Sequence, residues 1–213
     1  IFTALKFWDI SDKNNIKLLW QHQEVLGKDV AHNAYILNDY IYVAYYDRGT
    51  VIFDISDKDM PMKVADFDTS PFTDWQTPWT GVWNVYPYMQ NGFVALSDRQ
   101  KGLWLTQFDQ NKHAGKLLLT LKNGNGEVID DPNVKITLLN QTLNNQEVLF
   151  KYKNGKYFFK GVPGKEYQLN LTSNGETKLF KHTFDVNSNI QMEVKYNYLT
   201  SPKDLYSVNY LKS

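Results

Sequence analysis

One short motif occurs twice in the first half of this 213-residue chain and limits the folds that the chain can adopt. The segment Trp8-Asp-Ile-Ser-Asp-Lys13 returns as Phe53-Asp-Ile-Ser-Asp-Lys58, at an offset of 45 residues. Two weaker echoes recur in the same order at longer offsets, namely Asn33-Ala-Tyr35 with Asn84-Val-Tyr86 and Asp47-Arg48 with Asp98-Arg99. A period of about 40–50 residues is typical of β-propellers, in which each blade is a sheet of four strands.

The residues of one repeat predict such a blade. Four short runs have the composition and alternation of strands, at 33–37, 40–45, 50–55 and 62–67. Turn residues separate them, with Asn38-Asp39 after the first run and Asp47-Arg48-Gly49 after the second. The Ser and Asp residues of the repeated motif are expected to end a strand, because such side chains bond nearby backbone amides.

The repeat is too short for a closed ring. Residues 1–112 hold about two and a half units, whereas closed propellers use roughly four to eight blades. An unclosed stack would leave apolar edges exposed. We therefore expect the remaining blades, or a protein partner, to complete the ring. The sequence starts at Ile1 without an initiator Met or a signal peptide, as a processed or truncated product would.

The composition changes near His113. All six tryptophans precede this residue, and the segment 109–115 is polar and small, as expected of a linker. Seven further strands are predicted, at 116–122, 134–140, 147–152, 156–161, 166–173, 178–186 and 189–196. The chain is therefore predicted to be all-β, with a partial β-propeller (its last two to three blades) in residues 1–112 and a C-terminal seven-stranded β-sandwich in residues 113–197. Residues 198–213 form a tail, either a linker or an ordered edge.

The first module carries the paired Asp-Ile-Ser-Asp units, the His32-Asn33 pair and the stretch Gly81-Val-Trp-Asn-Val-Tyr-Pro87 that leads to Gly102-Leu-Trp-Leu105. With these residues it resembles the LVIVD-repeat propellers and, more narrowly, the choice-of-anchor B family of bacterial surface proteins. The resemblance covers about half of the chain and implies an extracellular propeller whose last blade is the closing stretch. It implies no ligand. The chain departs from the family because it lacks the earlier blades.

The second module carries Asn125-Gly-Glu-Val128, Asn154-Gly-Lys-Tyr-Phe-Phe159 and Gly161-Val-Pro-Gly164. In these motifs it is similar to the carboxypeptidase-regulatory-like, prealbumin-type sandwiches. Such modules act as spacers or docking units and occur in outer-membrane and secreted proteins of Bacteroidota. The resemblance therefore implies an extracellular, cell-surface location in association with the outer membrane.

Candidate ligand-binding residues lie where the repeat begins. His32, Asn33 and Asn84 precede or open the innermost strands, where propeller side chains face the central channel. They are candidates for holding a metal or a small polar molecule. The alternative is that they bond the backbone of the neighbouring blade and fix the start of the strand. One histidine cannot make a zinc site, because such a site needs three or four ligands.

Three tryptophans form the second group of candidates. Trp75, Trp79 and Trp83 lie in or beside an irregular insertion. Exposed aromatic rings stack on sugars or anchor protein partners, and the alternative is a loop that buries its indoles. If any residues of this chain touch a ligand, we expect these.

Several classes of chemistry find no support. The chain has no cysteine, which excludes disulfides, thiolate metal sites and a cysteine nucleophile. The repeated aspartates are expected to be structural, because an active site has no need to recur. Lysine plus arginine balance aspartate plus glutamate at 23 each, so no concentrated basic face for nucleic acid is expected. No apolar run approaches the roughly 20 residues that span a membrane. We expect no cofactor, no metal and no catalytic residue.

The leading hypothesis is a non-enzymatic cell-surface protein that binds or scaffolds within an outer-membrane-associated assembly. Two alternatives stay open. The chain can be an accessory fragment of a larger carbohydrate-active enzyme whose active site lies in the missing blades, or a glycan-binding module that uses the loop from Trp75 to Trp83.

Overall fold

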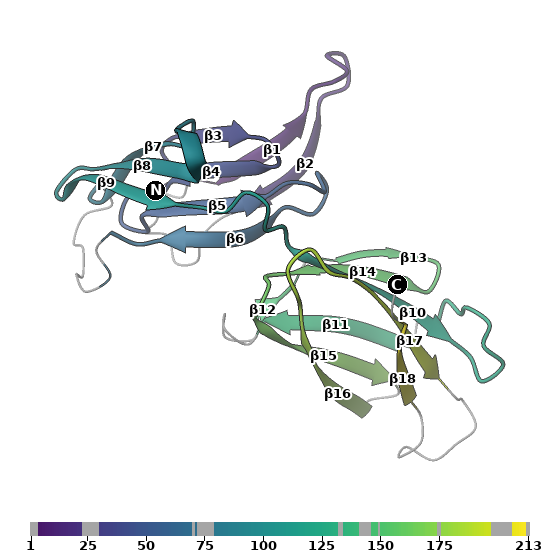
Figure 1. Ribbon diagram of the computed structural model, residues 1–213. Helices are drawn as coiled ribbons and strands as arrows, with labels where there is room; N and C mark the ends of the chain where they lie inside the picture. Colours follow the sequence, from purple (N-terminus) through teal and green to yellow (C-terminus); the bar gives the residue numbers. More distant parts are fainter. Residues whose placement is uncertain are drawn as a thin grey trace. The chain divides into compact units, whose positions relative to one another are not determined.

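The computed structural model describes residues 4–22, 30–69, 71, 79–131, 134–140, 146–148, 150–173, 176–196 and 206–211. Apart from one turn of 3-10 helix, η1 (Gln90–Gly92), the regular elements of these residues are strands, so the predicted all-β class is confirmed (Figure 1). The chain divides into two compact units, residues 1–112 and 113–213.

The described part of the first unit forms three antiparallel sheets that follow one another along the chain. The first sheet holds β1 (Leu5–Asp9) and β2 (Lys17–His22); the middle sheet holds β3 (Ala34–Leu37), β4 (Tyr40–Ala44), β5 (Thr50–Asp54) and β6 (Met62–Phe67); and the third sheet holds β7 (Val82–Tyr86), β8 (Phe93–Asp98) and β9 (Gly102–Gln107). The middle sheet is a four-stranded meander, and its strands match the predicted runs. Its assignment as a propeller blade stays a prediction.

The repeated aspartates end strands by accepting hydrogen bonds from nearby backbone. Asp9 Oδ1 accepts from the amide of Ser11 at 2.9 Å, and Asp54 Oδ1 accepts from the amide of Ser56 at 2.8 Å. These bonds satisfy amides that the sheet no longer pairs. The expectation that the motif ends a strand through such bonds is therefore confirmed for Asp9 and Asp54.

The middle sheet is buried on both faces. The face toward the third sheet, called the front face here, carries Tyr40, Tyr42, Ala44 and Ile52, which pack with Val82, Val85, Val94 and Leu96. The opposite or back face carries Ile41, Val43, Tyr45, Val51 and Phe53, which pack with Trp20 of the first sheet. Strands buried on both faces lack polar alternation, which explains the continuous apolar runs of β4 and β5.

In its described residues the second unit forms two sheets with nine strands, whereas the sequence predicted seven. The first sheet has the order β13-β14-β10-β17-β18, and the second has the order β12-β11-β15-β16. The bounds are β10 (Gly115–Lys122), β11 (Val134–Asn140), β12 (Gln146–Glu147), β13 (Phe150–Lys153), β14 (Lys156–Gly161), β15 (Glu166–Ser173), β16 (Glu176–Thr183), β17 (Asn189–Tyr196) and β18 (Tyr206–Leu211).

Two differences account for the wrong strand count. The run 147–152, predicted as one strand, is split between the sheets: the amide of Val148 donates to Leu138 O at 2.7 Å, whereas Phe150 pairs with Phe159 of the other sheet. The predicted tail contains β18, which pairs with β17. For residues 206–211 the ordered edge, not the linker, is therefore the correct alternative; residues 198–205 and 212–213 lie outside the described residues.

Candidate functional site

Five of the six predicted site residues come together where the middle sheet meets the third sheet. His32 and Asn33 precede β3, Trp83 and Asn84 lie on β7, and Trp79 lies shortly before β7. With Tyr46 they form what we call the aromatic cluster. The sixth predicted residue, Trp75, lies outside the described residues.

Backbone and side-chain bonds fix the cluster. The amide of His32 donates to Ala44 O at 2.9 Å, and the amide of Ala44 donates to Asn33 O at 2.8 Å, so both residues are held against the end of β4. His32 Nδ1 lies 2.8 Å from Trp83 O, and Asn33 Nδ2 donates to Asn84 Oδ1 at 3.1 Å. His32 therefore bonds the backbone of the neighbouring sheet and Asn33 bonds one of its side chains. A ligand at these residues stays a prediction.

The contact with Trp83 fixes the tautomer of His32. A carbonyl oxygen only accepts hydrogen bonds, so Nδ1 must carry the hydrogen that it donates to Trp83 O. The neutral ring then has its lone pair on Nε2. Because His32 is exposed, it offers an acceptor beside the neighbouring indole.

A bulge in β7 directs the ring of Trp83. Val82 pairs with Asp98 and Asn84 pairs with Ser97, which leaves Trp83 as the extra residue. Bulges bend a strand and re-aim a side chain. The Trp83 indole lies 5.5 Å from the His32 ring, between centroids, and the residue is 46% exposed.

Tyr46 completes the cluster and was missed by the sequence analysis. Its ring lies 5.2 Å from that of His32 and 5.6 Å from that of Trp79, between centroids. Its φ of 44° is unfavourable for a bulky residue, which costs about 1–3 kcal/mol and is often found at functional sites. Two backbone bonds with Val82, at 3.0 and 2.8 Å, hold this conformation. An aromatic residue just before the Asp47-Arg48 turn was the available signal.

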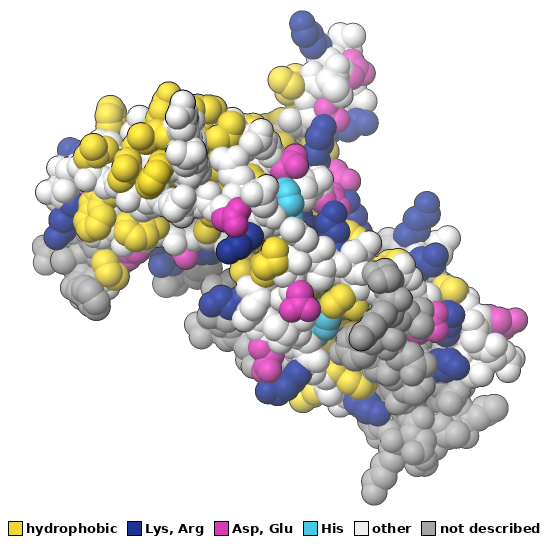
Figure 2. All heavy atoms as spheres, viewed as in Figure 1, with side chains coloured by type: hydrophobic (Ala, Val, Ile, Leu, Met, Phe, Trp, Pro, Cys, Tyr) yellow, Lys and Arg dark blue, Asp and Glu magenta, His cyan; other side chains and the backbone are white. Residues whose placement is uncertain are grey.

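A second feature is the uncovered front face of the third sheet. β5 and β9 are equivalent strands of their sheets, and each follows a hairpin that ends at a glycine, Gly49 or Gly102. Counted from these glycines, Leu103 and Leu105 of β9 occupy the positions of Thr50 and Ile52 in β5. Thr50 and Ile52 are 3% and 6% exposed, whereas Leu103 and Leu105 are 77% and 54% exposed. Figure 2 shows hydrophobic side chains gathered over β7 to β9. Leu103 also lines a shallow hollow of about 190 Å³ with Tyr86 and Ala95.

The first sheet has the matching exposure on its back face. Trp8 occupies in the repeated motif the position of Phe53, and it pairs with Leu18 of β2. Phe53 is 1% exposed, whereas Trp8 and Leu18 are each 45% exposed. The stack of three sheets therefore ends in an apolar face on both sides.

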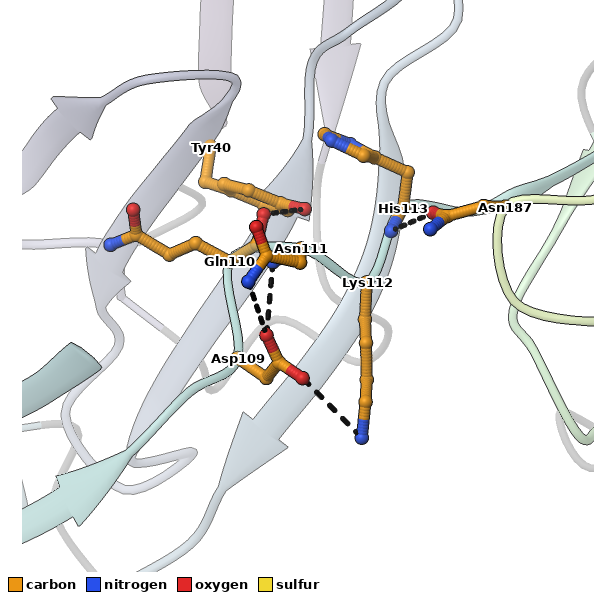
Figure 3. Close-up of polar contacts among 7 residues, drawn as sticks. All are labelled: Tyr40, Asp109, Gln110, Asn111, Lys112, His113 and Asn187. Carbon is orange, nitrogen blue, oxygen red and sulfur yellow. Dashed lines mark hydrogen bonds and ion pairs between the residues drawn. The ribbon is translucent and has the colours of Figure 1, made fainter. Parts of the chain in front are cut away.

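A broad depression of about 950 Å³ lies beside the last residues of the first unit. Tyr40 Oη donates to Gln110 O at 3.0 Å (Figure 3). Gln110 Nε2 donates to Tyr42 Oη at 3.1 Å. Burial raises the pKa of the Tyr40 and Tyr42 hydroxyls, so both stay neutral and keep these bonds. The polar groups of this depression mainly bond one another.

The segment predicted as a linker is bonded on both sides of the boundary. Asp109 Oδ1 accepts from the amide of Asn111 at 3.0 Å within the first unit, and the His113 amide donates to Asn187 Oδ1 at 2.9 Å within the second (Figure 3). Gly115 already begins β10.

The described residues contain no group of three or more His, Cys, Asp or Glu side chains that could hold a metal ion. The same part of the chain forms no helix with the length and hydropathy that a membrane crossing requires.

Comparison with known proteins adds a weak structural likeness. No protein family and no curated protein matches the sequence. Among solved structures, the chain is similar to PorZ, described as an essential bacterial surface component of the type-IX secretion system of Porphyromonas gingivalis, with 11% identity and a TM-score of 0.29. The match covers 81% of this chain and 24% of PorZ, so the chain spans about a quarter of that protein. A likeness at this level carries no inference about function.

Proposed function

We propose that this chain is a non-enzymatic scaffold of the cell surface, in which the first unit forms the last blades of a β-propeller. The second unit is then a β-sandwich that spaces or docks it. The observation that supports the proposal most is the exposure of Leu103 and Leu105 at positions that are buried in the middle sheet.

The stack of sheets ends in an exposed front face on one side and an exposed back face on the other. Within the unit, the front face of one sheet packs on the back face of the next, through Tyr42 and Ile52 against Val94 and Leu96. The uncovered front face of the third sheet therefore fits the back face of another sheet of the same repeat. Burying one leucine side chain contributes about 1.5–3 kcal/mol, so these faces favour association.

The location rests on the sequence alone. The resemblance of the first unit to surface propellers favours the outside of the cell, and the resemblance of the second unit to sandwiches of outer-membrane proteins favours the outer membrane. An accessory role in a larger carbohydrate-active enzyme stays the alternative, with an active site in the remaining blades.

Self-association of the isolated 213-residue chain tests the proposal. We expect sedimentation at micromolar concentrations to show dimers or larger assemblies, because a front face of one copy can cover a back face of another. The double substitution Leu103→Lys with Leu105→Lys is expected to return the chain to a monomer.

Leu179→Lys is the matched control, because Leu179 of the second unit is 57% exposed. This variant is expected to associate like the unsubstituted chain. A monomeric unsubstituted chain with a cooperative unfolding transition would contradict the proposal.

A further inference from the structure

We propose that the aromatic cluster binds a neutral saccharide, with Trp83 as the stacking ring and His32, Asn33 and Asn84 as hydrogen-bonding partners. This site is separate from the sheet faces of the proposed scaffold, and it does not depend on them. Three independent observations support it: the exposure of the rings, the acceptors and donors beside them, and the local strain.

The rings offer an apolar platform in contact with water. Trp79 and Trp83 are both exposed, and Tyr46 connects them through the His32 ring. An indole combines a large apolar face with little conformational entropy to lose, which favours stacking. The bulge at Trp83 interrupts the strand pairing, and the φ of 44° at Tyr46 is energetically unfavourable, so this arrangement lowers the stability of the fold.

The polar groups beside Trp83 suit hydroxyls, which both donate and accept. His32 Nε2 is an acceptor in the tautomer that the Trp83 contact imposes. Asn33 and Asn84 are joined by one bond between their side chains. Asn84 Oδ1 also accepts from the amide of Val85 at 3.0 Å, so the Asn84 side chain keeps only donor capacity, whereas the Asn33 side chain keeps a donor and an acceptor. The pair can therefore also serve a ligand.

The charge of the cluster favours a neutral ligand over a cation. Aromatic rings also attract ammonium groups. However, Arg99 Nη1 donates to Trp79 O and places a positive charge at the edge of the cluster. This charge repels a cation, while a neutral sugar ring stacks without regard to it.

The six tryptophan indole N–H signals in NMR spectra of the labelled chain test the site directly. The probes are neutral trisaccharides of glucose, mannose, galactose and N-acetylglucosamine at millimolar concentrations. We expect at least one of them to shift the Trp83 signal, which the Trp83→Phe variant identifies. Trp83→Ala is expected to weaken that binding at least about tenfold, as removal of a central aromatic anchor does.

Matched variants separate binding from folding. Trp8→Ala removes an indole of similar exposure from the first sheet and is expected to leave saccharide binding unchanged. His32→Phe keeps a ring but removes the acceptor, and we expect severalfold weaker binding with the β8 amide signals unchanged. If no probe shifts the Trp79 or Trp83 signal, or if Trp83→Ala and Trp83→Phe bind as the unsubstituted chain does, the proposal is wrong. The scaffold proposal would stand in either case.

Discussion

Replacing Phe184 by alanine is expected to lower the free energy of unfolding of the second unit by about 3–5 kcal/mol, the usual range for a buried phenylalanine. Phe184 is fully buried, and its ring lies 5.1 Å from that of Tyr167 and 4.5 Å from that of His182, between centroids. The ring also covers Gly161, where an added Cβ would lie 2.2 Å from Phe184 Cδ2. Amide hydrogen exchange in β10 and β15 measures the loss.

A double-mutant cycle makes this prediction specific to the contact. Gly161→Ala alone is expected to cost about 1–3 kcal/mol, because the new methyl group overlaps the ring. In the Phe184→Ala background the same methyl group enters space that the ring has left, so its cost should fall close to zero. Additive effects of the two substitutions would show that Phe184 does not rest on Gly161.

The second large effect is expected for Gly81→Ala, which should cost on the order of 3 kcal/mol in the first unit. Gly81 has a φ of 86°, and an added Cβ would lie 2.2 Å from Tyr46 O. An alanine at such a φ costs about 1–2 kcal/mol. The overlap adds to this cost, because the two backbone bonds between Tyr46 and Val82 must move.

Gly102→Ala is the matched control for this effect. Gly102 has a similar φ of 81°, but nothing lies within 4 Å of its added Cβ. The difference between the two variants therefore isolates the contact with Tyr46. Tryptophan fluorescence reports the unfolding, because all six tryptophans lie in the first unit. Equal losses for the two variants would contradict the description of this junction.

The sequence predicted the middle sheet closely for a physical reason. Asn38 and Gly49 adopt positive φ values in the turns that were predicted from their residue types, and turns of this kind set where strands begin and end. In β4 and β5 the residues at both odd and even positions are mostly apolar, so both faces of these strands had to be buried.

Other features depend on contacts that local patterns do not encode. The run 147–152 is split because the Val148 amide bonds Leu138 in one sheet, whereas Phe150 pairs with a strand of the other sheet. The pattern of residues within the run does not show which sheet each part will join. β18 left a signal that was overlooked, since Tyr206, Val208 and Tyr210 alternate with Ser207 and Asn209.

The candidate site was predicted in part. The repeat offset makes Trp83 equivalent to His32 and Asn84 equivalent to Asn33, and the structure brings both pairs into contact. Tyr46 reaches these residues because its backbone adopts a positive φ, which its residue type does not predict. The sequence also contained a signal for the exposed leucines. Consecutive residues of a strand face opposite sides, and Leu103, Trp104 and Leu105 are all apolar, as expected of a strand that is covered on both faces.

Chemical labelling of position 103 tests the central claim, that another sheet covers the front face of the third sheet. The chain contains no cysteine, so Leu103→Cys creates a single reactive site. In intact cells that naturally make the protein, we expect this thiol to react with a maleimide as slowly as one introduced by Thr50→Cys, at the equivalent buried position. A thiol introduced by Lys101→Cys, in the exposed turn beside it, should react fast. Labelling of Leu103→Cys as fast as Lys101→Cys would show that the face stays open to water and would contradict the account.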